Sequence, residues 1–305
     1  MRAVRFNEYG DEDVLDVRQV ENPRVAPGRV LVRVKAAAIN PGENYIRSGA
    51  AAAMFPTTFP SGQGSDLAGE IVALGEGVTG FTVGQAVLGW TDERASHAEL
   101  VAVPADHLIP KPQALSWEVA GSMCIAPMAA LASVRAVAPK PGETVVVSAA
   151  AGGVGSVAVQ LVRRTGATVI GLAGEQNHAW LRAHGVIPVS YGEGQADRIR
   201  EAANDRLDAF IDTFGSGYVD LALALGITPS RISTIIDLGA AKKHGVPFIT
   251  GGDIASVETL GELAALVAAG DLEIPIARTY SLDRVRDAYR DLADRHTHGK
   301  IVLRP

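Results

Sequence analysis

The sequence predicts an α/β protein that joins a β-rich domain to a domain built on a doubly wound parallel sheet. Residues 1–117 give short apolar runs separated by turn residues, and residues 29–39 (RVLVRVKAAAI) alternate in the period-2 manner of a half-buried strand. The chain then alternates strand-like and helix-like segments as far as residue 270, which is the pattern of parallel βαβ units. A glycine-rich loop joins the first such strand to the helix after it.

The individual elements follow from local patterns. Residues 68–89 give brief apolar runs cut by glycines at near-regular intervals, as in a compact barrel. A helical pattern with Ser116 as its N-cap runs from residue 116 to 137. The next segments predict strands at 144–148, 168–172, 187–189, 209–212 and 232–236, and helices at 154–164, 178–184, 195–203, 218–225 and 257–269. A helix over 282–294 and a short strand in GKIVLRP (299–305) close the chain, and we expect this strand to lie back on the N-terminal domain.

Composition excludes several classes of protein. The chain has 305 residues, of which 47% are hydrophobic, so it can build the cores of two domains. A net charge of −6 without a basic block argues against a nucleic-acid or anionic-membrane partner. The single cysteine, Cys124, excludes an internal disulfide and a cysteine-built zinc site. The N-terminal segment lacks the apolar stretch of a signal peptide, and we expect a cytoplasmic protein with no membrane span.

The stretch VVVSAAAGGVGSVAVQL at residues 145–161 indicates a dinucleotide loop. Its pattern is A-x-x-G-x-x-G, and a helix N-terminus after small residues suits a pyrophosphate. A strand before the loop, an amphipathic helix after it and a second strand at the right distance strengthen the interpretation. The alternative is an ordinary tight strand-to-helix turn. The predicted cofactor contacts are Ala149, Gly152, Gly153, Val154 and Gly155.

The second strand of this unit bears on the choice of cofactor. An NAD site places an acid at the tip of that strand to bind the ribose hydroxyl, but residues 171–174 (GLAG) contain no acid and Glu175 comes a little late. The missing acid favours NADP over NAD and disfavours S-adenosylmethionine. No Lys or Arg stands at the tip either. Gly174 and His178 are therefore the predicted contacts, with Arg182 nearby, and the alternative for His178 and Arg182 is an ordinary exposed helix position.

Several stretches occur in an order that matches one family. They are AAAINPGENYIRSG at 36–49, PSGQGSDLAGEIVALGEGVTGFTVGQAV at 60–87, SHAEL at 96–100, the A-x-x-G-x-x-G loop, and GKIVL at 299–303. In this order and spacing the chain resembles the quinone oxidoreductase branch of the medium-chain dehydrogenase/reductase family over essentially its whole length.

The resemblance implies a GroES-like, β-rich catalytic domain, here residues 1–117 and 271–305, and an inserted Rossmann domain, here residues 118–270. It also implies a cleft between the two domains, NADPH as the hydride donor, and a homodimer. Zinc-dependent relatives carry a cysteine where this chain has Asn40, and Gly-His-Glu where it has residues 64–66 (GSD). We therefore expect no metal, which disfavours alcohol oxidation through a zinc alkoxide and favours hydride transfer to a quinone or an α,β-unsaturated carbonyl.

The resemblance also suggests roles for single residues. Tyr45 would lie by the substrate as a hydrogen-bond donor or stacking wall, or else be a packing aromatic. Asn40 would orient the nicotinamide or the substrate carbonyl, or else be a turn residue before a proline. Tyr191 would touch the adenosine phosphate, with an edge aromatic as the alternative. Ala129 stands where the family has a cofactor-contacting threonine, and Asp66 more naturally braces a loop than acts as an acid.

Two other functions remain open from the sequence. The chain could be a dedicated enoyl reductase of a biosynthetic pathway, which only a substrate screen would separate from a quinone reductase. It could also be a non-catalytic NADPH-binding sensor or partner subunit, because the cofactor contacts at Ala129 and Gln176 depart from the family pattern.

Overall fold

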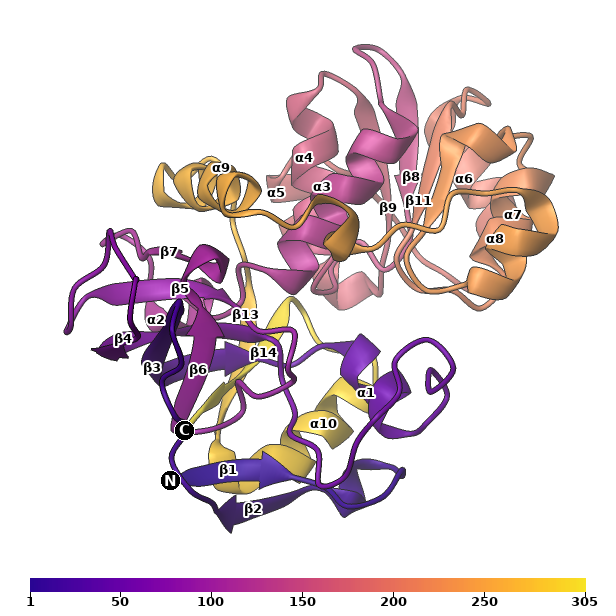
Figure 1. The fold of residues 1–305 in the computed structure, drawn as a ribbon. Helices are drawn as coiled ribbons and strands as arrows, with labels where there is room; N and C mark the ends of the chain where they lie inside the picture. The colour runs from indigo at the N-terminus through magenta and orange to yellow at the C-terminus, as the bar shows by residue number, and fades with distance from the viewer. The chain divides into compact units, whose positions relative to one another are not determined.

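The computed structural model describes residues 1–305, which fold as two units (Figure 1). The first comprises residues 1–125 and 256–305, and the second comprises residues 126–255. The sequence suggested 118–270 for the inserted domain. The boundaries differ because the helix after residue 255 packs on a strand of the first unit, and because the chain leaves that unit only at Ile125.

The first unit is a seven-stranded sheet centred on β3 (Arg29–Ala38). The strand order is β13-β14-β3-β4-β5-β7, and β6 also pairs with β3. The other bounds are β4 Asp66–Leu74, β5 Ala86–Trp90, β6 Leu100–Pro104, β7 Leu108–Pro110, β13 Ile276–Ser281 and β14 Lys300–Arg304. Val30, Val32 and Val34 on β3 alternate into a core with residues of β4, β5 and β6, as the period-2 pattern predicts. The closing strand, β14, pairs with β3 in this unit, as expected.

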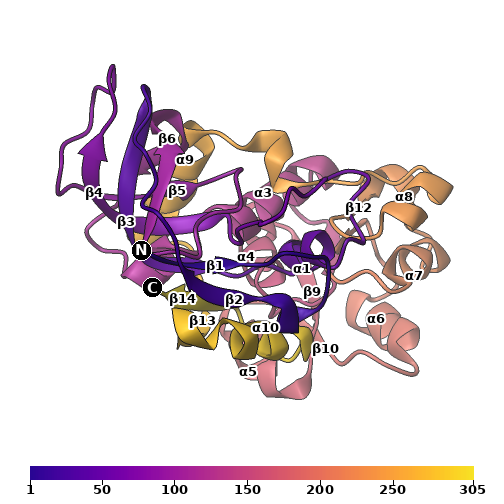
Figure 2. The same ribbon diagram turned by 60° about the horizontal axis from the view of Figure 1, so that its bottom comes forward.

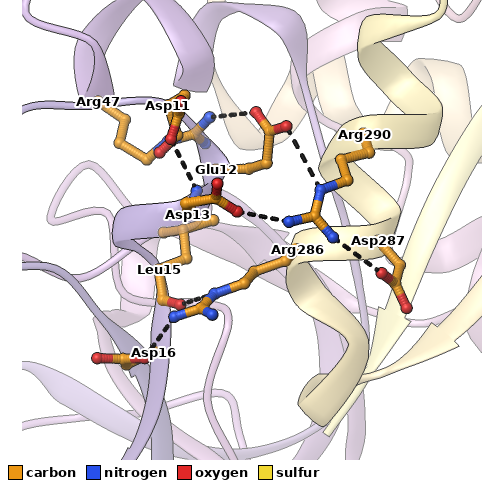
Figure 3. Close-up of polar contacts among 9 residues, drawn as sticks. All are labelled: Asp11, Glu12, Asp13, Leu15, Asp16, Arg47, Arg286, Asp287 and Arg290. Carbon is orange, nitrogen blue, oxygen red and sulfur yellow. Dashed lines mark hydrogen bonds and ion pairs between the residues drawn. The ribbon is translucent and has the colours of Figure 1, made fainter.

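A small antiparallel pair, β1 (Arg2–Arg5) and β2 (Asp16–Gln19), lies beside α10 (Val285–Ala293) in both ribbon views (Figures 1 and 2). Phe6, Leu15 and Tyr289 share a buried core between them. Figure 3 shows the polar rim of this contact: Arg290 pairs with Glu12 and Asp13, and Arg286 donates to the Leu15 carbonyl and to Asp16. The two ends of the chain lie close to each other in both ribbon views (Figures 1 and 2).

The remaining helices of the first unit are two short ones and a longer one. They are α1 Pro41–Arg47, α2 Trp117–Ala120 and α9 Val257–Ala268, with 3-10 turns η1 Glu12–Val14, η2 Ala105–His107 and η6 Leu282–Arg284. Asn40 is the N-cap of α1 and Pro41 its first residue, a position where the missing N–H of proline costs nothing.

The second unit is a five-stranded parallel sheet in the order β10-β9-β8-β11-β12. The strands are β8 Thr144–Val147, β9 Thr168–Leu172, β10 Ile187–Val189, β11 Ala209–Asp212 and β12 Ile232–Thr234. The helices are α3 Ile125–Val137, α4 Gly155–Arg164, α5 His178–Ala183, α6 Gln195–Ala203, α7 Tyr218–Ala224 and α8 Leu238–His244, with 3-10 turns η3 Glu175–Asn177, η4 Pro229–Arg231 and η5 Gly251–Ile254. Figure 1 shows α4 and α5 on one side of the sheet and α6, α7 and α8 on the other, so both faces are covered.

The structure corrects three element predictions. The helix expected over 116–137 is broken into α2 and α3, because Asp66 accepts hydrogen bonds from the backbone N–H groups of Cys124 and Ile125. The strand expected at 232–236 ends at Thr234. Helix α8 was not predicted, and its sequence signal is the N-cap Asp237, whose side chain accepts from the Ala240 N–H.

No helix is both long enough and apolar enough to cross a membrane.

The core of the parallel sheet allows a first prediction. Phe210 lies at the centre of β11 and is fully buried with Val146, Ile170 and Ile232. Phe210→Ala should lower the free energy of unfolding by about 3–5 kcal/mol, because it leaves a cavity that the flanking strands cannot fill. Urea denaturation followed by circular dichroism measures this. Val83→Ala is the control, since Val83 is 63% exposed and its loss should cost less than about 0.5 kcal/mol.

Candidate dinucleotide site and buried polar cluster

The loop between β8 and α4 has the backbone shape of an anion cradle. Ala149 lies at φ +44°, in the left-handed region that glycine favours, so the chain turns sharply at this residue. The Gly152 N–H donates to the Ala149 carbonyl at 2.8 Å and closes the turn. A Cβ at Gly155 would lie 2.1 Å from that carbonyl oxygen, so only glycine lets the helix begin this close to the loop.

The first turn of α4 is free of side-chain caps. Val154, the N-cap residue, makes no capping hydrogen bond, and the helix has basic residues only in its last turn. The Ser156 and Val157 N–H groups donate to the Gly152 and Val154 carbonyls, so this end of α4 offers the loop the positive end of the helix dipole without a side-chain cap over it. The five predicted loop residues lie together, and their arrangement fits a pyrophosphate.

The tip of β9 carries the other predicted contacts. Gly174 is the N-cap of η3, and a Cβ there would lie 2.5 Å from the side-chain oxygen of Gln176, so the Gln176 amide covers this glycine. The Nε2 of His178 lies 3.2 Å from the Ala173 carbonyl oxygen, which holds the imidazole against the strand end. Because β10 pairs with β9, Tyr191, half exposed just after β10, belongs to the same edge of the sheet.

Ala129 lies elsewhere, in the middle of α3. It is buried, and its carbonyl accepts a hydrogen bond from the Ser133 hydroxyl at 2.8 Å. Arg182 is exposed on α5.

The first unit contains a buried polar cluster around Asn40. The Lys300 ammonium donates to the Asn40 side-chain oxygen at 2.6 Å and to the Ile39 carbonyl at 3.1 Å. The Asn40 amide nitrogen donates to Asp66 at 2.9 Å. The other Asp66 oxygen accepts from the Cys124 and Ile125 N–H groups at 3.0 and 2.9 Å, which anchors the start of α3.

The same cluster continues through the buried face of α1. Glu43 accepts from the Asn40 N–H at 2.9 Å and from the Tyr289 hydroxyl at 2.5 Å. The Arg47 guanidinium lies 4.7 Å from the centre of the Tyr289 ring and donates to the carbonyl of Asp11. Two cations and two carboxylates are therefore buried together, and each carboxylate is hydrogen-bonded.

Burial decides the direction in which these groups titrate. Desolvation raises the pKa of the Asp66 carboxyl, although the Lys300 charge and the Asn40 hydrogen bond oppose it. Desolvation likewise lowers the pKa of Lys300, against the charges of Asp66 and Glu43. Each partner thus opposes the pKa shift that burial imposes on the other, so the cluster depends on keeping all its members.

Tyr45 and Asn40 differ in their exposure to solvent. Glu43 and Arg47 lie one turn apart on the buried face of α1, whereas Tyr45, between them in sequence, is 41% exposed. Tyr45 is therefore available to a ligand. Both polar atoms of the Asn40 side chain are engaged within the cluster and the residue is buried, so in this structure it fixes α1 in place.

The sequence interpretation missed Lys300 and Tyr289. The signal for Lys300 was available, since it is the one charged residue between Gly299 and the apolar run of β14. The role of Asp66 as a brace was expected, but its partners were not, because they come from the distant start of α3.

The chain matches two protein families and several full-length relatives. Residues 26–113 match the family described as alcohol dehydrogenase GroES-like domain, and residues 181–303 match the family described as zinc-binding dehydrogenase. A quinone oxidoreductase of Pseudomonas aeruginosa is 30% identical over 328 aligned positions, covering 100% of this chain and 99% of the relative. The human quinone oxidoreductase is 29% identical and covers 99% and 97%.

Comparison with solved structures also finds a quinone oxidoreductase. The quinone oxidoreductase from Coxiella burnetii superposes with a TM-score of 0.89 at 30% identity, covering 100% of this chain and 99% of the other. These matches confirm the predicted fold class, a GroES-like domain with a Rossmann-type sheet.

One of the matched families is described as zinc-binding, and the cluster does not fit that ion. Zinc needs thiolate, imidazole or carboxylate ligands. Asn40 supplies an amide that is already engaged, both Asp66 oxygens accept hydrogen bonds, and the Lys300 ammonium provides a cation next to them. No group of three or more His, Cys, Asp or Glu side chains is arranged to hold a metal.

The cluster predicts that removing one buried charge lowers the free energy of unfolding more than removing two opposite charges together. Lys300→Met should lower the free energy of unfolding by about 3 kcal/mol, because the buried carboxylate of Asp66 loses its cation. The Lys300→Met/Asp66→Asn double variant should recover part of that loss. Urea denaturation measures both, and Lys35→Met, which removes a partly exposed pair with Glu70, should cost less than about 1 kcal/mol. Additive losses in the double variant would contradict the coupling.

The geometry of the glycine-rich loop predicts an effect on dinucleotide affinity. Gly155→Ala places a Cβ against the Ala149 carbonyl and must displace the loop, so dinucleotide affinity should fall by about tenfold, or 1.4 kcal/mol. Titration with a reduced nicotinamide dinucleotide, followed by its fluorescence, measures the dissociation constant. Gly261→Ala in α9 is the control, since a Cβ there meets nothing within 4 Å. Unchanged affinity in Gly155→Ala would mean that the loop does not hold the dinucleotide.

Proposed function

Because the chain belongs to the quinone oxidoreductase branch of the medium-chain dehydrogenase/reductase family, we propose that it is an NADPH-dependent reductase of quinones or α,β-unsaturated carbonyl compounds that works without zinc. The observation that carries the proposal is the full-length likeness to the P. aeruginosa quinone oxidoreductase. A bound reduced nicotinamide supplies the hydride, and the protein supplies binding, orientation and polar groups.

The second unit binds the cofactor in this proposal. The loop from Ala149 to Gly155 and the uncapped start of α4 hold the pyrophosphate. The tip of β9 receives the adenosine ribose, and it presents the Gln176 amide and the His178 ring with no acid from residue 171 to 174. A carboxylate at that tip would favour the free ribose hydroxyl of NAD, so its absence there supports NADPH.

The first unit contributes the polar group that meets the substrate. Tyr45 presents its ring and hydroxyl from the outer face of α1, and the buried cluster of Asn40, Glu43 and Lys300 keeps that helix fixed. As hydride reaches a conjugated carbon, negative charge develops on the carbonyl oxygen. The Tyr45 hydroxyl donates a hydrogen bond to that oxygen and lowers the barrier. Asn40 acts as a positioning residue through its hold on α1.

The proposal is tested by mixing the pure chain with NADPH and a panel of benzoquinones, naphthoquinones and cyclic enones. We expect oxidation of NADPH, seen as loss of its near-ultraviolet absorbance, with a lower KM for NADPH than for NADH. Tyr45→Phe should reduce kcat by about a hundredfold while cofactor affinity is kept, because only the donor to the oxyanion is lost.

Tyr280→Phe is the matched control. The Tyr280 hydroxyl, on β13, donates a hydrogen bond to Asp291 on α10, so its role is structural. No turnover of any acceptor with either cofactor would contradict the proposed reaction. Full activity in Tyr45→Phe would exclude Tyr45 from the proposed reaction. A lower KM for NADH than for NADPH would mean that NADH is the cofactor.

A further inference from the structure

A buried carboxylate with no assigned role lies at the carboxyl end of β11. Asp212 is fully buried, yet four donors converge on it. One of its oxygens accepts from the Ser148 hydroxyl at 2.8 Å and from the N–H groups of Phe214 and Gly215 at 3.0 and 2.9 Å. The other accepts from the Thr234 hydroxyl at 2.8 Å. A carboxylate can be buried at this depth only with such a set of donors.

These bonds join three neighbouring strands at one edge of the sheet. Ser148 directly follows β8, Asp212 ends β11 and Thr234 ends β12, and β11 lies between the other two. Thr213 closes the ring, because its N–H donates to the Ser148 hydroxyl at 2.9 Å and its own hydroxyl donates to the Ser148 carbonyl at 2.6 Å. Ser148 is also the residue before Ala149, so the ring reaches the dinucleotide loop itself.

The ring also holds a loop of uncommon backbone shape. Gly215, Ser216 and Gly217 follow Asp212 with φ values of +80°, +53° and +88°, and α7 begins at Tyr218. Ser216 has a side chain and pays a conformational cost in the left-handed region. The two backbone bonds from Phe214 and Gly215 to Asp212 hold the start of this run of left-handed residues.

The position of this loop in the sheet indicates which half of a dinucleotide it meets. The chain passes from β8 through α4 to β9 on one side, whereas β11 pairs with β8 on the other, so the strand order reverses between β8 and β11. Ligands of doubly wound sheets bind at such a reversal, beyond the carboxyl ends of the strands. In the proposed function the tip of β9 would hold the adenosine half, which would leave the nicotinamide half toward β11.

We propose that Asp212 is a positioning residue for the nicotinamide half of the cofactor: with Ser148 and Thr234 it sets the shape of the loop at residues 213–217, against which the nicotinamide end lies. The inference rests on the proposed function, because it requires dinucleotide binding. It predicts that Asp212 changes the affinity for a whole dinucleotide and leaves the affinity for its adenosine half unchanged.

The test is calorimetric titration of the full chain with NADPH and with 2′,5′-ADP, which lacks the nicotinamide half. Asp212→Asn keeps the size of the side chain, but its amide nitrogen would face the Thr234 hydroxyl, whose oxygen already accepts from the Asp237 N–H. The dissociation constant for NADPH should rise about tenfold and that for 2′,5′-ADP should stay within about twofold.

Asp208→Asn is the matched control. Asp208 precedes the same strand, and its carboxylate accepts from the Thr144 N–H at 2.8 Å, at the opposite end of β8 and β11. The Asp208→Asn variant should bind NADPH and 2′,5′-ADP with unchanged affinity. Thr234→Val removes one donor from Asp212 at a strand end away from the loop at residues 149–155, and it serves as a milder second variant if Asp212→Asn does not fold. It should weaken NADPH binding in the same direction and leave the affinity for 2′,5′-ADP within about twofold.

The outcomes separate the two proposals. A wild-type chain that binds neither NADPH nor NADH overturns the proposed function and this inference with it. A wild-type chain that binds NADPH, with Asp212→Asn binding it equally well, overturns the inference alone. A parallel loss of affinity for NADPH and 2′,5′-ADP in folded Asp212→Asn also overturns it, because a merely structural role would weaken both halves together.

Discussion

A carboxylate removed from water must be surrounded by donors, and this constraint shapes both units of the chain. In the first unit, Asp66 is fully buried and draws its donors from Asn40 and from the start of α3. In the second unit, Asp212 does the same with Ser148, Thr234 and two backbone N–H groups. Segments distant in sequence are held together because leaving either carboxylate unpaired would cost several kcal/mol.

The two carboxylates have different consequences. Asp66 belongs to a cluster that includes the buried cations Lys300 and Arg47, and the cluster fixes one face of α1 so that Tyr45 is presented on the other. Asp212 has no cation among its hydrogen-bond partners and is satisfied by hydroxyl and amide groups, which shape a loop. The ion pairs that α10 makes with η1 and β2 (Figure 3) are more exposed, so each contributes little to stability.

Most regular elements were predictable because their signals are local. Strand β9 and helix α6 have the bounds that the periodicity predicted, and the A-x-x-G-x-x-G loop begins a helix as expected. The long helix expected across residues 116–137 was not predictable as a broken one. Its interruption at residues 121–124 depends on Asp66, which lies far away in sequence, and on Gly121, where a Cβ would meet the Ala36 carbonyl at 2.5 Å.

By itself, the sequence determined the two kinds of domain, the glycine-rich turn that begins a helix, and the family, because hydrophobic period, glycine spacing and motif order can all be read from the order of residues. It also marked Tyr45, which the structure leaves exposed. Only the tertiary structure decided that Asn40 is engaged by Lys300 and Asp66, and that Asp212 joins three strand ends. Such partners are set by which strands become neighbours, since a buried polar group bonds whatever donor the fold brings within reach.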